Sequence, residues 1–379
     1  MAGIYLHIPF CKQACHYCDF HFSTSLGLKE QVLQAMRQEL ALQQHYLNGE
    51  TIDTIYFGGG TPSILSVAEL NELLETVYAQ HTVNPAAEIT LEANPDDLTL
   101  EKLQALRQTP VNRLSIGVQS FHDPHLQLMN RPHTAAEAAL SIKMAQDLGF
   151  RNISLDLIYG IPAENPALWE QDLSQAFALQ AQHLSCYALT IEPNTVFGHR
   201  VRKGKFSPAD EERVARQFEL LMTEAKAHGF LHYEISNFCQ PGYESKHNSS
   251  YWKQVPYVGI GPSAHSFNGV SRQFNLPNNS KYVQALAEGQ LPCTVEELSV
   301  EDRVNEYVMT TLRTSWGCDT RFIQEKWGVD LVALHAPYLQ KIATQGLLRQ
   351  EQGVLLLTEA GKLLADEIAL DLFLLQEEA

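Results

Sequence analysis

The feature that most constrains the fold of this 379-residue chain is a regular alternation of short apolar runs and helical patterns. Apolar runs of strand length lie at residues 4–8, 52–57, 88–92, 113–117, 153–158 and 184–190. Patterns with helical spacing follow them at residues 28–46, 66–78, 98–107, 134–148, 167–180 and 208–228. Parallel neighbours in a sheet need crossover connections, so these units predict an α/β fold with a parallel sheet.

Most of the unusual residues of the chain stand where these predicted strands end. Three cysteines follow the first strand, GGGTP follows the second, and EANP and GVQS end the third and fourth. The carboxyl ends of parallel strands meet at one edge of a sheet, where α/β enzymes build their active sites. Six units are too few for a closed eight-unit barrel and allow an open sheet or a partial barrel. We expect a partial (β/α)6 barrel of the TIM type, with its functional face at that edge.

The chain divides into three predicted regions. Residues 1–238 form the partial barrel, and residues 239–298 form a loop-rich connecting segment that contains HNSSYW. Residues 299–379 are mainly helical, with a hairpin over 347–358 that turns at Gln352 and Gly353. Helices followed by a hairpin resemble a winged-helix module, but residues 341–379 carry more acidic than basic side chains. This C-terminal region is therefore expected to pack against the barrel and not to bind DNA.

The charge of the chain excludes some classes of partner. There are 44 acidic and 27 basic residues, which gives a formal net charge of −17. Phosphate binding needs a basic surface, so we expect no nucleic-acid partner. No apolar run reaches the ~18 residues of a membrane helix, and the N-terminus lacks the features of a signal peptide. We therefore expect a cytoplasmic protein with no transmembrane segment.

The cysteines indicate a metal site. Of seven cysteines, Cys11, Cys15 and Cys18 lie within eight residues of one another, which is typical of metal or cluster ligands in a chain without a secretion signal. Zinc held by these three cysteines with His16 or His21 is one interpretation. A [4Fe–4S] cluster held by three thiolates is the other, and it leaves one iron open to a further ligand. The spacing favours the cluster.

The CxxxCxxC spacing after the first strand resembles that of radical S-adenosylmethionine (SAM) enzymes. Further motifs in the same order extend the resemblance over nearly the whole chain: HIPFC, GGGTP, EANP, SIGVQSF, DLIYGIP and IEPNT. They are similar to the branch that contains oxygen-independent coproporphyrinogen III oxidases and heme chaperones. In this superfamily the open iron chelates the amino and carboxylate groups of SAM, and an electron from the cluster cleaves SAM to a 5′-deoxyadenosyl radical.

The resemblance also implies which residues form the SAM pocket. Cys11, Cys15 and Cys18 are the implied cluster ligands. Glycine lacks a Cβ and lets backbone approach a ligand closely, and an arginine can pair with a carboxylate in a forked geometry. The implied SAM contacts are Tyr5, Tyr17, Gly59, Gly60, Thr61, Glu92, Gln119, Arg131, Asp156 and Thr190.

Two motifs and the short N-terminus separate the chaperones of this branch from the oxidases. The oxidase motif continues to a fourth cysteine where this chain has Phe20, and the oxidases carry a longer N-terminal extension. HNSSYW matches the HNxxYW motif of the chaperones, in which His247 is the expected axial ligand of heme iron. His7, His232 and His265 are rival ligands.

The resemblance thus implies a chaperone that binds a [4Fe–4S] cluster, SAM and heme, and delivers heme to cytochromes. It leaves open whether SAM is cleaved productively. The alternatives are an oxygen-independent coproporphyrinogen III oxidase, which decarboxylates propionates oxidatively, and a zinc-stabilised binding module. The implied partners are a heme-accepting cytochrome or membrane respiratory protein, an electron donor to the cluster, and a second copy of the chain in a homodimer.

Overall fold

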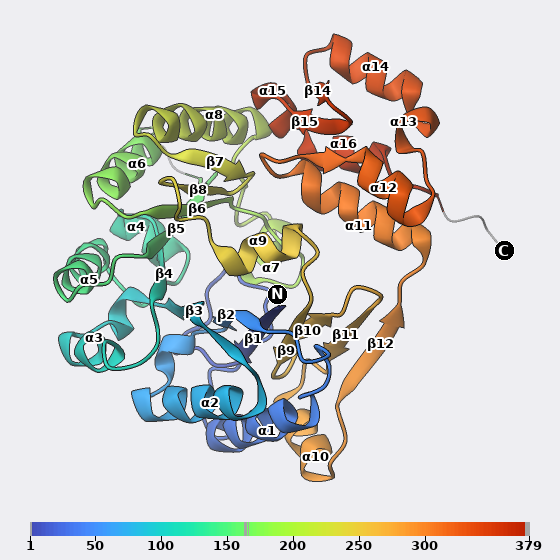
Figure 1. The fold of residues 1–379 in the computed structure, drawn as a ribbon. Coiled ribbons are helices and arrows are strands. Elements are labelled where there is room, and N and C mark those ends of the chain that lie inside the picture. Colours follow the sequence, from blue (N-terminus) through green and yellow to red (C-terminus); the bar gives the residue numbers. More distant parts are fainter. Residues whose placement is uncertain (1, 163–164, 166, 376–379) are drawn as a thin grey trace.

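The core of the fold is a set of six parallel strands. The computed structural model describes residues 2–162, 165 and 167–375. The strands pair in chain order and run parallel (Figure 1). They are β1 (Ala2–Ile8), β2 (Ile52–Gly59), β3 (Val83–Ala93), β4 (Arg113–Gln119), β5 (Ile153–Tyr159) and β6 (His183–Ala188). The prediction of an α/β fold with a parallel sheet is confirmed.

Helices connect these strands along the outer side of the curved sheet (Figure 1). They are α1 (Lys29–Leu42), α2 (Val67–Gln80), α3 (Leu100–Leu106), α5 (Ala135–Asp147), α6 (Leu168–Ala178) and α8 (Glu211–Ala227). Ser66 and Thr134 form capping boxes with Glu69 and Glu137, which fix the starts of α2 and α5. Two short helices that the sequence did not predict, α4 (Asp123–Leu128) and α7 (Val196–Arg202), lie on the loops after β4 and β6.

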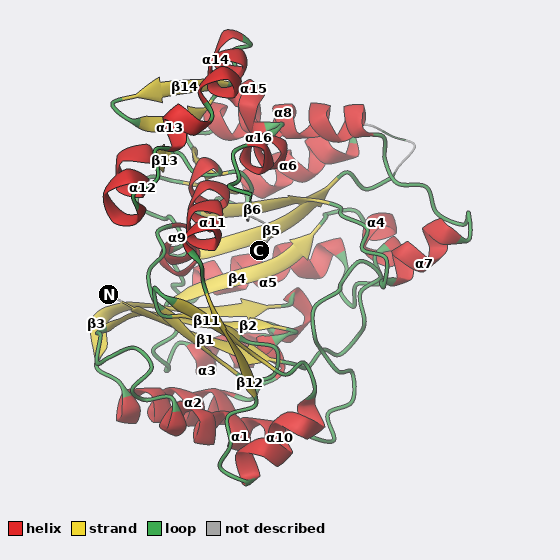
Figure 2. Ribbon diagram, turned by 90° about the vertical axis from the view of Figure 1, so that its right-hand side faces the viewer, coloured by secondary structure: helices red, strands yellow, loops and turns green. Residues whose placement is uncertain are grey.

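The parallel strands are extended on both sides by shorter ones. β1 pairs in parallel with β9 (Tyr257–Ile260), and β6 pairs antiparallel with β8 (Asn237–Cys239), which continues to β7 (Leu231–Glu234). On the other side β9 is followed by β10 (His265–Phe267), β11 (Ser271–Asn275) and β12 (Cys293–Glu297). Within the described residues the sheet therefore has two ends, at β12 and β7, as a partial barrel does (Figure 1). Figure 2 shows the end at β12, beside β11.

The connecting segment 239–298 is more regular than its sequence suggested. HNSSYW is not in a loop but in α9 (Lys246–Trp252), where the side chain of Ser245 accepts a hydrogen bond from the backbone N–H of Asn248. The segment also holds β9 to β12 and α10 (Asn279–Ala287). These strands are three to five residues long, too short for a periodic pattern, and they form because they pair with the barrel sheet.

The C-terminal region has its own core. It contains α11 (Val300–Leu312), α12 (Thr320–Trp327), α13 (Leu331–Leu334), α14 (Ala336–Thr344), α15 (Glu359–Lys362) and α16 (Ala365–Asp371), with a small sheet of β13 (Cys318–Asp319), β15 (Val354–Leu357) and β14 (Leu348–Glu351). The predicted hairpin is present, and Gln352 and Gly353 turn with φ of 50° and 84°. Val304, Val308 and Leu312 belong to a buried cluster distinct from that of the barrel. Residues 376–379 of the predicted region lie outside the described part of the chain.

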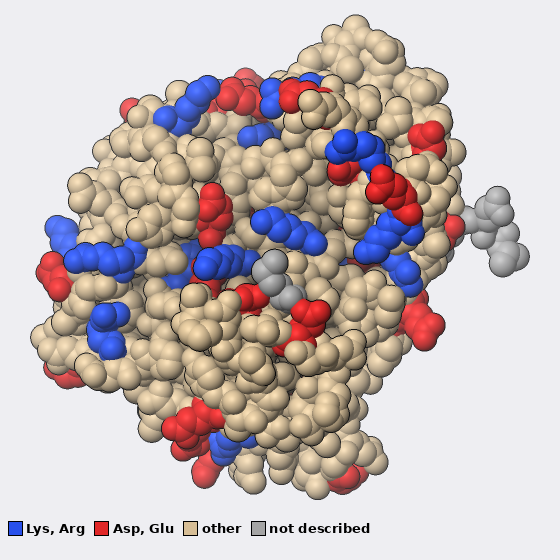
Figure 3. All heavy atoms as spheres, in the orientation of Figure 1, with Lys and Arg blue, Asp and Glu red and all other residues tan. Residues whose placement is uncertain are grey.

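The surface is mixed in charge on the face shown in Figure 3. Lysine and arginine side chains stand among aspartates and glutamates there, and large areas carry neither. In the described part of the chain, no helix combines the length and the apolar character that crossing a bilayer requires.

Candidate functional site

A cavity of about 530 Å³ lies at the carboxyl ends of the parallel strands. Its wall takes residues from the loops after β1, β2 and β3 and from the ends of β4, β5 and β6. This is where the sequence placed the functional face. The cavity brings together all but two of the predicted site residues: Cys11, Cys15, Cys18, Tyr17, Gly59, Gly60, Thr61, Glu92, Gln119, Arg131, Asp156 and Thr190. We call it the first cavity.

The three clustered cysteines are free thiols in the wall of the first cavity. Burial raises the pKa of Cys11 to about 11, against a hydrogen bond with Thr61, and burial raises the pKa of Cys18 to about 12. Both thiols are therefore protonated at neutral pH, and metal binding must displace their protons. Among the described residues, no three side chains of the kinds that bind metals are close enough together to surround a single ion.

Arg131 connects the cysteine loop to two strand ends. Its Nη2 donates to Asn94 Oδ1 at 2.6 Å and to the carbonyl of Gly117 at 2.7 Å, and its Nη1 donates to Cys15 Sγ at 3.4 Å. The Nε of Arg131 is also buried, and it has no partner among the described residues. Buried donors are almost always paired, so this one is available to an acceptor in the cavity.

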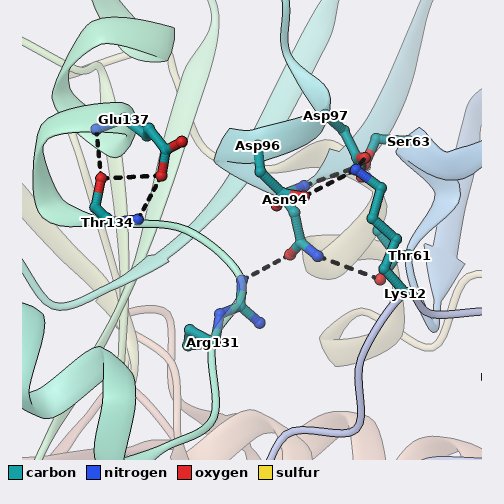
Figure 4. Close-up of polar contacts among 9 residues, drawn as sticks. All are labelled: Lys12, Thr61, Ser63, Asn94, Asp96, Asp97, Arg131, Thr134 and Glu137. Atoms are coloured by element: carbon teal, nitrogen blue, oxygen red, sulfur yellow. Dashed lines mark hydrogen bonds and ion pairs between the residues drawn. The ribbon is translucent and has the colours of Figure 1, made fainter.

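A polar network ties the same loop to the segments that follow β2 and β3 (Figure 4). Lys12 Nζ donates to Asp96 at 2.8 Å and also pairs with Asp97. Ser63 Oγ donates to Asp97 at 2.6 Å and accepts from the backbone N–H of Asn94 at 3.1 Å. Sequence reasoning did not assign these residues a role. Their only signal was their position inside or beside the loop motifs.

Gly59 and Gly60 of GGGTP are needed for close contact with the end of β1 and the residues that follow it. A Cβ on Gly60 would lie 2.6 Å from the carbonyl oxygen of Phe10. Gly59 has φ of 106°, and its Cβ would lie 2.7 Å from the imidazole of His7. The backbone N–H groups of Gly60 and Thr61 donate to Ile8 and Phe10. The missing Cβ atoms therefore let this loop lie directly on the end of β1, and both glycines still line the cavity.

A bulge positions Gln119 at the end of β4. The register with β5 shifts between Gly117 and Gln119, and Gln119 has φ of 67°. A Cβ on Gly117 would lie 2.9 Å from the Gln119 amide and 3.1 Å from Arg131. Bulges redirect side chains in this way, and here the glycine makes room for two cavity residues.

Two carboxyl groups, those of Glu92 and Asp156, line the first cavity. Burial raises the pKa of Glu92 to about 7, opposed by the hydroxyl of Tyr56, which donates to Glu92 at 2.7 Å. Burial also raises the pKa of Asp156 to about 6, opposed by Ser115. Both groups can thus accept hydrogen bonds from a ligand, and both resist full ionisation near neutral pH.

A second cavity, of about 510 Å³, adjoins the first. The two share Asp19, Phe20, Glu92 and Tyr187. Its other wall residues are mostly imidazole and phenol rings: Tyr5, His7, His21, Tyr56, His247, Asn248, Tyr251, Tyr257, Ser263 and His265. Tyr5, an implied SAM contact, lies here and not in the first cavity. The sequence missed this cavity because its wall joins β1 and β2 to segment 239–298.

His247, the predicted iron ligand, is closed off in this wall. It is 1% exposed, its Nδ1 lies 2.8 Å from Thr54 Oγ1, and its Nε2 lies 2.8 Å from the hydroxyl of Tyr251. Its ring stacks on Tyr56 with 4.9 Å between centroids. Burial lowers the pKa of His247 to about 3. The imidazole is neutral, and both of its nitrogens already have partners.

Comparisons with known proteins agree with this architecture. Residues 5–176 match the model of the radical SAM superfamily, and residues 298–364 match that of the HemN C-terminal domain. The chain is 37% identical to heme chaperone HemW of Bacillus subtilis, over 97% of this chain and 98% of that protein. It is 33% identical to heme chaperone HemW of Escherichia coli, over 98% of each. The structure of the Escherichia coli coproporphyrinogen III oxidase HemN has a TM-score of 0.85 at 23% identity and covers 98% of this chain and 90% of that one.

The parallel strands, the cysteine-lined cavity at their carboxyl ends and the matching superfamily model together define the fold class as that of a radical SAM protein. Within this class, identities of 31–37% to HemW proteins over nearly the full chain narrow the assignment. The chain belongs to the HemW family.

The superfamily implies a [4Fe–4S] cluster and SAM, and the residues of the first cavity fit both. Three free thiols on one loop supply ligands for three irons. The unpartnered Nε of Arg131 and the carboxyl groups of Glu92 and Asp156 supply donors and acceptors for a charged, hydroxyl-bearing ligand. These residues are the ones that would hold the two groups.

Proposed function

We propose that this protein is a chaperone that binds heme in the second cavity and delivers it to a cytochrome. The observation that carries the proposal is the wall of that cavity, in which imidazole and phenol rings surround a space of about 510 Å³ next to the cysteine loop. Imidazole is a common axial ligand of heme iron, and aromatic rings pack against flat apolar ligands. The relatives named heme chaperones, matched over nearly the full chain, support the same function.

The first cavity has a separate role in this proposal. Cys11, Cys15 and Cys18 hold the cluster, and Arg131, Glu92 and Asp156 orient SAM beside it. Cluster and SAM together supply one-electron reductive chemistry when bound. Arg131 also donates to Cys15 Sγ, so the same side chain holds the cysteine loop and lines the cavity proposed for SAM.

Two protein partners follow from the proposal. Delivery needs an acceptor that takes up heme, which we propose to be a cytochrome or a membrane respiratory protein. Reduction of the cluster needs an electron donor that reaches the cysteine loop.

The test is anaerobic reconstitution with iron and sulfide, followed by two assays on the same sample. The first is a titration with heme followed by transfer to an apocytochrome. We expect stoichiometric binding and the appearance of the holocytochrome spectrum. The second assay supplies coproporphyrinogen III, SAM and a reductant.

The second assay, together with a metal and sulfide analysis of the sample, decides between the chaperone and its alternatives. Vinyl products together with no heme binding would replace the chaperone proposal with a coproporphyrinogen III oxidase. Stoichiometric zinc in place of iron and sulfide would replace it with a zinc-stabilised binding module. The likeness to the HemN structure establishes the fold alone, since only 23% of the residues are identical.

A further inference from the structure

We propose that His265 supplies the axial imidazole nitrogen to the iron of heme held in the second cavity. The inference rests on the proposed function and assigns its iron ligand to a residue outside HNSSYW. Four imidazoles line the cavity, those of His7, His21, His247 and His265. Their hydrogen bonds and exposure distinguish them.

Two of the four have both ring nitrogens engaged. His247 lies between Thr54 and Tyr251, as described above. His7 is 5% exposed, its Nδ1 lies 3.2 Å from the hydroxyl of Tyr5, and its Nε2 lies 3.0 Å from the carbonyl oxygen of His21. Coordination of iron by either ring would break a buried hydrogen bond and leave its partner unpaired, at a cost of about 1–3 kcal/mol.

The other two have nitrogens to offer. His21 is partly buried and its Nε2 lies 2.8 Å from Asn279 Oδ1, which leaves Nδ1, the nitrogen nearer the backbone. His265 is exposed, and among the described residues neither of its ring nitrogens is within hydrogen-bonding distance of a partner. Burial of part of the ring and the charge of Arg272 lower the pKa of His265. The neutral imidazole, which is the form that binds metals, therefore predominates at neutral pH.

The turn that carries His265 is built rigidly. Gly261 has φ of 109°, and its Cβ would lie 2.5 Å from the carbonyl oxygen of His7. Ser263, two residues before His265, has φ of 66°, a conformation that non-glycine residues adopt rarely. The buried carboxylate of Glu39 accepts from the backbone N–H of Gly261 at 2.8 Å and from Asn275 Nδ2 at 2.7 Å.

These contacts fix the backbone of the turn that leads into β10 and His265. Asn275 Nδ2 also donates to the carbonyl oxygen of Gly261 at 2.9 Å, so the turn is held from both sides. Phe20 and Tyr187, 67% and 44% exposed, offer ring faces on the wall shared with the first cavity. Heme bound in this cavity would have the imidazole of His265 and these two rings in its wall.

The test uses the full-length protein, reconstituted with its cluster and titrated with heme. His265→Ala is compared with His247→Ala and His21→Ala, and His45→Ala serves as the control because His45 is an exposed histidine outside both cavities. The readouts are the Soret band, the electron paramagnetic resonance spectrum of the ferric heme, the dissociation constant of heme, and rescue by free imidazole.

We expect His265→Ala to weaken heme binding at least tenfold and to change both spectra, and free imidazole to restore the wild-type spectra. An unchanged spectrum in His265→Ala would overturn this assignment while leaving the proposed function in place. Loss with imidazole rescue in His247→Ala or His21→Ala would move the ligand to that residue. A wild-type protein that binds no heme at all would overturn the proposed function itself.

Discussion

The two cavities are of similar size but are built in different ways. The first is made at the ends of the parallel strands, from thiols, glycines, an arginine and carboxyl groups. The second is made from rings that come from β1, β2, the cysteine loop and segment 239–298. The first therefore depends on the order of the barrel strands, whereas the second depends on the docking of a segment distant in sequence. Changes in one should leave much of the other intact.

The largest expected effect is on the cluster alone. Replacement of Cys11, Cys15 and Cys18 together by alanine should abolish the cluster, measured as iron and sulfide per chain, because no thiolate remains on the loop. Heme binding should persist within about threefold, since these side chains do not line the second cavity. Cys293→Ala is the control, because Cys293 lines neither cavity. Loss of heme binding in the triple variant would show that the cavities are not independent.

Arg131→Ala should weaken the binding of SAM in the first cavity without abolishing it. The substitution removes donors to Asn94, Gly117 and Cys15. Removal of such supporting contacts typically costs 10- to 100-fold in affinity, so we expect SAM to bind about 10- to 100-fold more weakly in equilibrium dialysis. Arg37→Ala, which removes an exposed pair with Glu72, should change nothing. Wild-type SAM affinity in Arg131→Ala would remove Arg131 from the site.

Gly59→Ala tests the contact between a residue of the first cavity, Gly59, and a residue of the second, His7. The new Cβ would lie 2.7 Å from the imidazole of His7, a residue of the second cavity, although Gly59 lines the first. With the strained φ included, we expect a loss of roughly 2–4 kcal/mol in the free energy of unfolding, measured with urea. Both SAM and heme affinity should fall. Gly27→Ala should be neutral, because its Cβ would meet only Ser25 Oγ at an ordinary contact distance of 3.7 Å and its φ is not positive.

The smallest effect concerns Glu39, whose carboxylate holds the turn before His265. Burial raises the pKa of Glu39 to about 6 from an ordinary value of 4.5, so the folded protein binds this proton more tightly than the unfolded chain does. The wild type should therefore gain about 2 kcal/mol relative to Glu39→Gln as the pH falls from about 7.5 to about 4. Urea unfolding of both proteins at the two pH values measures the difference. An equal difference at both would mean that Glu39 does not titrate in this range.

Much of the fold could be predicted because the signals are local. Apolar periodicity gave the six parallel strands and their helices, and Ser66 and Thr134 mark helix starts through contacts only three residues away. Segment 239–298 escaped prediction because its strands form only by pairing with β1 and with one another. Pairing partners hundreds of residues apart leave no periodic mark on a strand of three to five residues.

The site divides in the same way. The family resemblance predicted Glu92 and Asp156 as SAM contacts, and parallel topology explains why both lie at one edge of the sheet. Tyr5 lies in the other cavity because the direction of a side chain depends on which face of the strand it takes. His247 was predicted as the iron ligand from its motif. Its hydrogen bonds to Thr54 and Tyr251 engage both ring nitrogens, and a sequence does not show such contacts.

The wall shared by the two cavities has a thermodynamic consequence. Asp19, Phe20, Glu92 and Tyr187 face both spaces, so a ligand that moves any of them on one side changes the binding surface on the other. Linkage then requires reciprocity: if occupancy of the first cavity changes the affinity of the second by some factor, occupancy of the second changes the first by the same factor. If a ligand in one cavity moves any of these four side chains, its binding thus changes how tightly the other cavity holds its own ligand.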